Sequence, residues 1–156
     1  MASVTWDTHA LPDELLAAYR ATRYRVFAPG RELLLHIDQR DESLAKLLRE
    51  AWVEGGALIT AWNPGSQRQS VETNRALQNQ LVRELEAAGH PCLAARNEAE
   101  ADQAADVWNE DSVLALDIGL EPARDIAARY GQLAFLWIDR QATPRLIITA
   151  ARPKPV

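Results

Sequence analysis

The chain has 156 residues, which is enough for one domain with a substantial core and too few for two domains of ordinary size. Hydrophobic residues make up 47% of the chain and charged residues 25%, as in an ordinary globular protein. The 22 acidic and 17 basic side chains give a net charge of -5, which argues against general nucleic-acid binding, because that function needs a basic face to neutralise phosphates.

The N-terminal part of the chain predicts a helix, a β-hairpin and a second helix. Residues 12–14 place a proline and two acidic side chains where a helix N-terminus favours them. The apolar runs 24–27 and 33–37 flank a Pro-Gly pair, which is typical of a hairpin. Asp41 can cap the next helix, whose apolar residues recur at helical spacing until Gly55-Gly56 ends it.

From residue 57 onward, strands alternate with helices. Helices are expected to begin at Ser70, whose residue type favours a cap position, and at Glu121, which precedes a proline. The four expected strands cover residues 57–62, 92–97, 112–118 and 133–138.

Three further segments complete the chain. Residues 98–107 are acidic and alanine-rich and predict a loose helix or a surface loop. A last strand is expected at 145–149, and a tail with two prolines covers 152–156.

The order strand, helix, strand, strand, helix, strand over about residues 57–139 predicts a ferredoxin-like βαββαβ core. We therefore expect one α+β domain over residues 1–151, with a mixed or antiparallel sheet that the N-terminal helix, hairpin and helix extend or cover. The alternative is a doubly wound parallel sheet. No clear crossover helix separates the strands at 92–97 and 112–118, which counts against that alternative.

The loop Asn63-Pro64-Gly65-Ser66 lies between a strand and the helix that starts at Ser70. Proline, glycine and asparagine make turns for backbone reasons alone, so a plain connecting loop is one interpretation. The other is that free backbone N–H groups near the helix N-terminus, with the hydroxyls of Ser66 and Ser70, hold an anion.

Asn74 occupies a position on the long helix where an apolar residue would be expected. It shares one helix face with Leu77, Leu81 and Leu85, at the end nearest the loop. A buried amide must find hydrogen-bond partners or lose about 1–3 kcal/mol. Asn74 therefore either ties down the loop backbone or contacts a ligand, and both can hold.

Glu110 and Gln132 each precede a predicted strand. Glu110 follows Trp108, which either fills a gap in the core or forms an aromatic wall beside the carboxylate. In the split βαβ arrangement the strand at 57–62 has antiparallel neighbours on both sides, so each neighbour begins where that strand ends. We therefore expect Glu110 and Gln132 to reach Asn63 from opposite sides, with Asn74 on the inward face of the helix.

Location and cofactors follow from what the sequence lacks. Cys92 is the only cysteine, no apolar run approaches the roughly 18 residues of a membrane span, and no signal-peptide pattern opens the chain, so a cytoplasmic protein without membrane association is expected. The histidines have no metal-like spacing with Cys92, and no phosphate-loop or dinucleotide motif occurs. We expect neither a metal nor a cofactor.

The motifs just described resemble a known family when they are taken together. Thr60-Ala61-Trp62-Asn63-Pro64, Asn74, Trp108-x-Glu110-x-Ser112 and Gly131-Gln132 are similar to the bacterial domain of unknown function 3293, and the resemblance extends from about residue 19 to about residue 149. It implies that the polar residues named above form one signature, and it carries no assigned activity. The family pattern has a Glu-Asn pair in the helix, whereas this chain has Thr73-Asn74, which removes any helix glutamate from the inferred signature.

Three functions are left open. The first is binding of a small polar or anionic ligand by Trp62, Asn63, Ser66, Ser70, Asn74, Trp108, Glu110 and Gln132. The second is an enzyme, a hydrolase or a transferase, with Glu110 as its general base. The third is an interaction module, acting as a homodimer or with a protein partner, in which the signature only stabilises the fold.

Overall fold

The computed structural model describes residues 11–99 and 109–149. The predictions for Trp108, for most of segment 98–107 and for the tail at 152–156 lie outside these residues. The elements, in chain order, are α1 (Asp13–Ala21), β1 (Arg23–Ala28), β2 (Arg31–Leu35), α2 (Glu42–Glu50), β3 (Gly56–Ile59), a 3-10 turn η2 (Pro64–Ser66), α3 (Val71–Ala87), β4 (Cys92–Glu98), β5 (Glu110–Leu116), α4 (Leu120–Arg129), β6 (Ala134–Ile138) and β7 (Pro144–Ile148).

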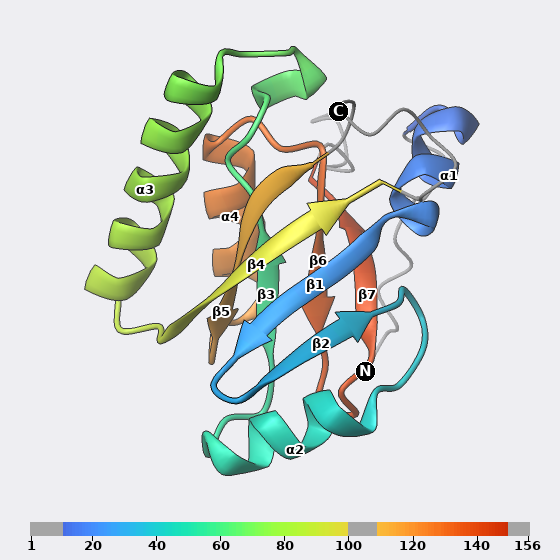
Figure 1. Cartoon of the computed structure of the whole chain (residues 1–156), viewed down its shortest axis with the longest axis vertical. Coiled ribbons are helices and arrows are strands. Elements are labelled where there is room, and N and C mark those ends of the chain that lie inside the picture. The colour runs from blue at the N-terminus through green and yellow to red at the C-terminus, as the bar shows by residue number, and fades with distance from the viewer. Residues whose placement is uncertain (1–10, 100–108, 150–156) are drawn as a thin grey trace, which may run out of the picture.

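All seven strands form one sheet in the order β2-β1-β4-β5-β3-β6-β7 (Figure 1). Every neighbouring pair is antiparallel, so the parallel alternative is wrong and the α+β class is confirmed. The short central strand β3 lies between β5 and β6, as expected from the strand order. The four strands assigned to a ferredoxin-like core are not a separate unit, because β1 and β2 continue the sheet beyond β4 and β7 continues it beyond β6.

Helices cover both faces of this twisted sheet. On one face, α3 and α4 bury Leu81, Leu85 and Ile126 against side chains such as Ile59 and Val113. On the opposite face, α2 packs its buried leucines against the inner side chains of β1 and β2. Adjacent residues of β3 serve both cores, because successive side chains of a strand point to opposite faces.

Side-chain caps start two of the helices where the sequence predicts them. Asp41 accepts a hydrogen bond from the Leu44 backbone N–H at the start of α2, and Ser70 accepts one from Thr73 at the start of α3. Each cap satisfies one of the backbone donors that a helix N-terminus leaves unpaired. The cap at Ser70 fixes where α3 begins and thus how the preceding loop must turn.

Strand β3 ends at Ile59, three residues before its predicted end. The reason is that the next backbone donors bond to side chains instead of to a neighbouring strand. The Ala61 N–H donates to Oε1 of Gln78 at 2.8 Å, and the Trp62 N–H donates to the hydroxyl of Thr60 at 3.1 Å. The chain leaves the sheet at this point, which places the loop over the sheet end.

No helix in the described parts of the chain is both long and apolar enough to cross a membrane.

Candidate functional site

The loop after β3 is held in a sharply turned conformation. Asn63 has a φ of 47° and a ψ of 61°, and Gly65 and Ser66 also have positive φ values, 66° and 61°. Glycine and asparagine adopt this left-handed region at the least cost, which accounts for their presence here. The Ser66 N–H closes the turn on the Asn63 carbonyl oxygen at 2.9 Å.

Asn63 and Asn74 form the centre of a hydrogen-bond network under this loop. The Asn63 backbone N–H donates to Asn74 Oδ1, and Asn74 Nδ2 donates to Asn63 Oδ1, each at 2.9 Å. The Gln69 N–H also donates to Asn63 Oδ1, at 3.0 Å. Asn74 is only 2% exposed, so its amide group ties the loop to α3 from within the core.

Glu110 comes to this network from the first residue of β5. The Asn63 Nδ2 group donates to Glu110 Oε1 at 3.3 Å. Burial raises the pKa of the Glu110 carboxyl group from its ordinary value of 4.5 to about 7, and the hydrogen bond from Asn63 opposes part of that rise. Near neutral pH the group is therefore a mixture of the carboxylate and the carboxylic acid.

Gln132 arrives from the other side, before β6. Its Nε2 donates to the Trp62 carbonyl oxygen at 3.0 Å and to that of Tyr130 at 3.2 Å. Next to it, the Gly65 N–H donates to the Gly131 carbonyl oxygen at 2.7 Å. The turn between α4 and β6 is thus bonded directly to the turn after β3.

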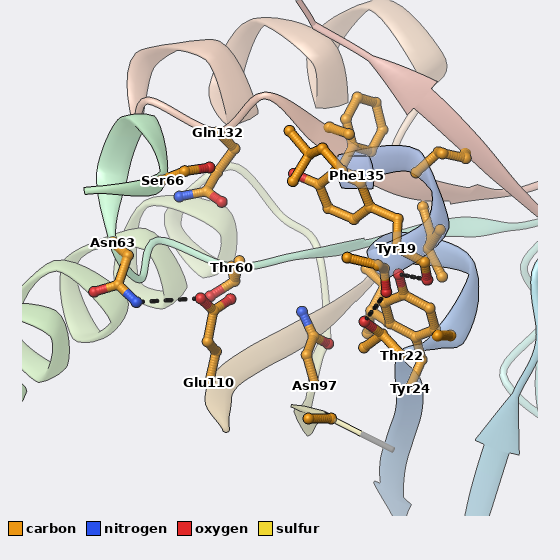
Figure 2. Close-up of a pocket in the computed structure, with 18 residues that line it drawn as sticks. Tyr19, Thr22, Tyr24, Thr60, Asn63, Ser66, Asn97, Glu110, Gln132 and Phe135 are labelled. Carbon is orange, nitrogen blue, oxygen red and sulfur yellow. Dashed lines mark hydrogen bonds between the residues drawn. The ribbon is translucent and has the colours of Figure 1, made fainter. Parts of the chain in front are cut away.

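A cavity of about 80 Å³ opens where these segments meet, on the face of the sheet that α1 covers (Figure 2). Asn63, Glu110 and Gln132 lie toward one end of it, and Tyr24 and the residues of α1 lie toward the other. Other polar side chains in the wall are Thr22, Thr60, Ser66 and Asn97. We call this space the site cavity.

The expected gathering of polar side chains is present. Asn63, Asn74 and Glu110 are joined by hydrogen bonds, and Gln132 bonds to the carbonyl group immediately before Asn63. Asn63, Ser66, Glu110 and Gln132 line the site cavity.

The remaining candidates have other places. Asn74 braces the loop from behind, and Ser70 is exposed and caps α3, so neither lines the cavity. Trp62 is half-buried and also does not line it; its indole N–H is buried and bonds to none of the described residues. Trp108 lies outside the described residues. Trp62, Ser70 and Asn74 are thus absent from the described lining of the site cavity, and their contact with a ligand stays a prediction.

Sequence reasoning did not name five polar side chains of the wall as site residues: Tyr19, Thr22, Tyr24, Thr60 and Asn97. Tyr19 comes from α1, Thr60 from the residue after β3, and Asn97 from β4. Asn97 is the cross-strand partner of Glu110 in the β4–β5 pair. The sequence alone could not place Asn97 at the cavity, because a one-residue shift in the register of the β4–β5 pair would turn its side chain to the other face.

The described lining of the site cavity carries acidic but no basic side chains. Glu110 is the only ionisable carboxyl group among its described lining residues, and no lysine, arginine or histidine is among them. Burial raises the pKa of the Tyr19 hydroxyl to about 12, so it stays neutral. Within the described residues no group of three histidine, cysteine or acidic side chains could hold a metal ion.

Cys92 does not belong to this site. It begins β4, is half-buried, and its thiol donates to the His90 carbonyl oxygen at 3.4 Å. Burial raises the pKa of the thiol to about 11, which disfavours the reactive thiolate.

The fold and the site together define an α+β protein with a seven-stranded antiparallel sheet and a polar cluster at one end of its central strand. Residues 59–135 match the model of the family described as "Protein of unknown function (DUF3293)", and this part of the chain belongs to that family. The match covers the loop, α3, Glu110 and Gln132, in agreement with the resemblance seen in the motifs. No curated protein and no solved structure matches the chain.

Proposed function

We propose that the protein binds a small polar molecule in the site cavity. The observation that carries the proposal is that polar side chains from separate segments meet at the wall of a cavity and do not close it. Ligand sites typically combine an apolar hollow with a few convergent polar groups. Here Asn63, Glu110 and Gln132 supply those groups, and Leu58 and Leu136 are among the apolar residues.

The sequence predicts a polar or anionic ligand, and the side chains of the wall disfavour the anionic one. Gln132 Nε2 already donates twice to backbone carbonyls, and Asn63 Nδ2 already donates to Glu110. An anion would face a partly ionised Glu110 with no basic residue among the described lining. The proposal is therefore for an uncharged or cationic polar ligand.

A thermal-shift screen of chemically diverse small molecules tests the proposal. Ala18 lines the cavity from α1, so Ala18→Leu would place a branched side chain inside it. Ala17 is the exposed neighbour on the same helix, and Ala17→Leu is the matched control. We expect at least one ligand whose stabilisation of the protein is kept in Ala17→Leu and lost in Ala18→Leu. If no compound stabilises the wild-type protein, or if Ala18→Leu leaves every shift unchanged, the proposal is wrong.

A second candidate function is an enzyme with Glu110 as general acid or base. The observation that favours it is the pKa of about 7, because proton transfer is most efficient when the pKa of the catalytic group lies near the working pH. A ligand found in the screen would be assayed for turnover. Retained binding with lost turnover in Glu110→Gln would support catalysis, and a ligand that is never converted would leave binding as the function.

The interaction-module hypothesis required that the signature amides leave no cavity, and a cavity lies beside them. Pairing with a second copy or with a protein partner, on a surface away from the signature, stays a prediction.

A further inference from the structure

Building on the proposed function, we infer that the site cavity takes the cationic amino group of a small amine, held by the Glu110 carboxylate and the Asn97 side-chain carbonyl oxygen.

Two side chains with acceptor oxygens, Asn97 and Glu110, lie on adjacent strands of the cavity wall. Asn97 of β4 and Glu110 of β5 are directly paired in the sheet, so their side chains stand on the same face, about 4.5–5.5 Å apart at their Cβ atoms. Both line the cavity (Figure 2). The Asn97 Oδ1 atom is buried and has no hydrogen-bond partner. The Asn97 Nδ2 atom lies on the side of Glu110 (Figure 2), so a half-turn of the amide would bring Oδ1 to the cavity. A buried acceptor without a donor is unfavourable, and a ligand that donates would favour that turn.

The polar groups of the wall differ in how many hydrogen bonds they already make. Within the described residues, the one hydrogen bond that Glu110 accepts comes from Asn63, at a long 3.3 Å. The Gln132 amide nitrogen already donates twice, whereas its oxygen accepts no hydrogen bond from the described part of the chain. The wall therefore presents acceptors from Glu110 and Gln132, and the half-turn of the Asn97 amide would add a third. An ammonium group has three donors and no acceptor, so it complements this wall.

The charge of the cavity wall also favours a cation. The described lining residues include one carboxyl group and no basic side chain. A carboxylate or phosphate ligand would be repelled by ionised Glu110, and no basic side chain among the described lining residues would offset that repulsion. An alcohol could donate only once and would leave the other acceptors unsatisfied. A cation gains a charge-assisted hydrogen bond, which is stronger than a neutral one.

The volume of the cavity and its apolar end also suit a small amine. A cavity of about 80 Å³ has room for several waters, which is enough for an aminomethyl head group. The rings of Tyr19 and Tyr24 also line the cavity. Aromatic faces attract cations and cover hydrocarbon, so they suit the carbon attached to an amine. The rest of such a ligand would extend toward the opening.

The test compares three probes that share one ring, namely benzylamine, benzyl alcohol and benzoate, titrated at pH 8 and followed by NMR chemical shifts. Protein variants are Glu110→Gln, which removes the charge with little change of shape, and Asp111→Asn as the control. Asp111 is the next residue of β5 and its side chain is exposed. We expect benzylamine to bind about tenfold or more tightly than either other probe, and Glu110→Gln to weaken it about tenfold or more. Asp111→Asn should change its affinity by about twofold or less.

Asn97→Leu gives an independent reading, because it removes the second acceptor and leaves the carboxylate in place. It should weaken benzylamine and leave benzyl alcohol little changed.

Tighter or equal binding of benzoate or benzyl alcohol would overturn the amine assignment, as would unchanged affinity in Glu110→Gln. Absence of binding by all three probes would overturn it as well. In each case the proposed function is judged separately, by the diverse screen with Ala18→Leu and Ala17→Leu, so the failure of one proposal is distinguishable from the failure of the other.

Discussion

Asn63 and Asn74 lie on opposite sides of a turn and exchange two hydrogen bonds, each 2.9 Å long. The Asn74 side chain thereby takes the place of a neighbouring strand for the Asn63 N–H. It also directs the Asn63 side chain, whose Nδ2 group is left pointing at Glu110. One buried amide thus sets both the backbone of the loop and the orientation of a cavity-lining residue.

Replacing Asn74 with alanine should destabilise the protein by about 2–3 kcal/mol, because the Asn63 N–H would lose its partner inside the structure. Urea unfolding measures this change. Asn79→Ala on the exposed face of α3 is the control and should change the free energy of unfolding by about 0.5 kcal/mol or less. Equal effects of the two substitutions would show that the amide of Asn74 is not what fixes the loop.

Glu110 should make the protein less stable as the pH rises. Its pKa is raised in the folded state, from 4.5 to about 7, so folding favours the protonated form. Its contribution is most favourable below about pH 4.5 and is lost as the pH increases through 7. The expected loss between pH 5 and pH 8 is about 2.5 kcal/mol, from about 1.36 kcal/mol for each pKa unit.

Glu110→Gln should remove this pH dependence and stabilise the protein at pH 8, as measured by urea unfolding at both pH values. Asp111→Asn should retain the dependence seen in the wild-type protein. A wild-type protein that is as stable at pH 8 as at pH 5, after the Glu110→Gln curve is subtracted, would contradict the raised pKa.

Binding of benzylamine, if the amine assignment is right, should strengthen as Glu110 ionises. With a pKa of about 7, about a tenth of the protein carries the carboxylate at pH 6 and about nine tenths at pH 8. The affinity should therefore rise about tenfold between these pH values. NMR titrations at pH 6 and pH 8 measure it, and the rise should vanish in Glu110→Gln. A flat profile in the wild-type protein would be evidence against ionic recognition.

Gly131→Ala should destabilise the protein more than Gly89→Ala. Both glycines have positive φ values, 69° and 93°, so each substitution carries a backbone cost of about 1 kcal/mol or more. A Cβ at Gly131 would also meet Pro64 Cβ at 2.8 Å, whereas one at Gly89 would meet nothing within 4 Å. The excess, about 1–3 kcal/mol from the clash, is measured by urea unfolding of the two variants. Equal costs would mean that the two turns separate easily.

Local patterns were sufficient for much of the fold. Asp41 and Ser70 cap helices because of their residue type and position, and those caps are visible in any single sequence. The meeting of Glu110 and Gln132 near Asn63 followed from strand order, since antiparallel neighbours of one strand start where it ends. Both inferences depend on contacts within one element or on the direction of the chain.

What could not be predicted depends on tertiary register. The apolar run through Trp62 looks like strand to its end, yet side chains of α3 take the backbone donors and β3 stops at Ile59. Asn97 faces the cavity only because β4 pairs with β5 in one register of two possible faces. The raised pKa of Glu110 comes from burial in the folded protein, and the residues next to it in the sequence do not predict that burial.

Helix α1 forms one wall of the cavity, yet it contains no fully buried residue and precedes the matched segment 59–135. Substitutions at Leu15 or Ala18 would therefore alter the size and polarity of the hollow at little cost in folding free energy. The hydrogen-bonded end around Asn63 would keep its geometry. In engineering terms, the hydrogen-bonded end of the cavity and the wall formed by α1 are separate pieces of the chain, so one can be redesigned while the other is held constant.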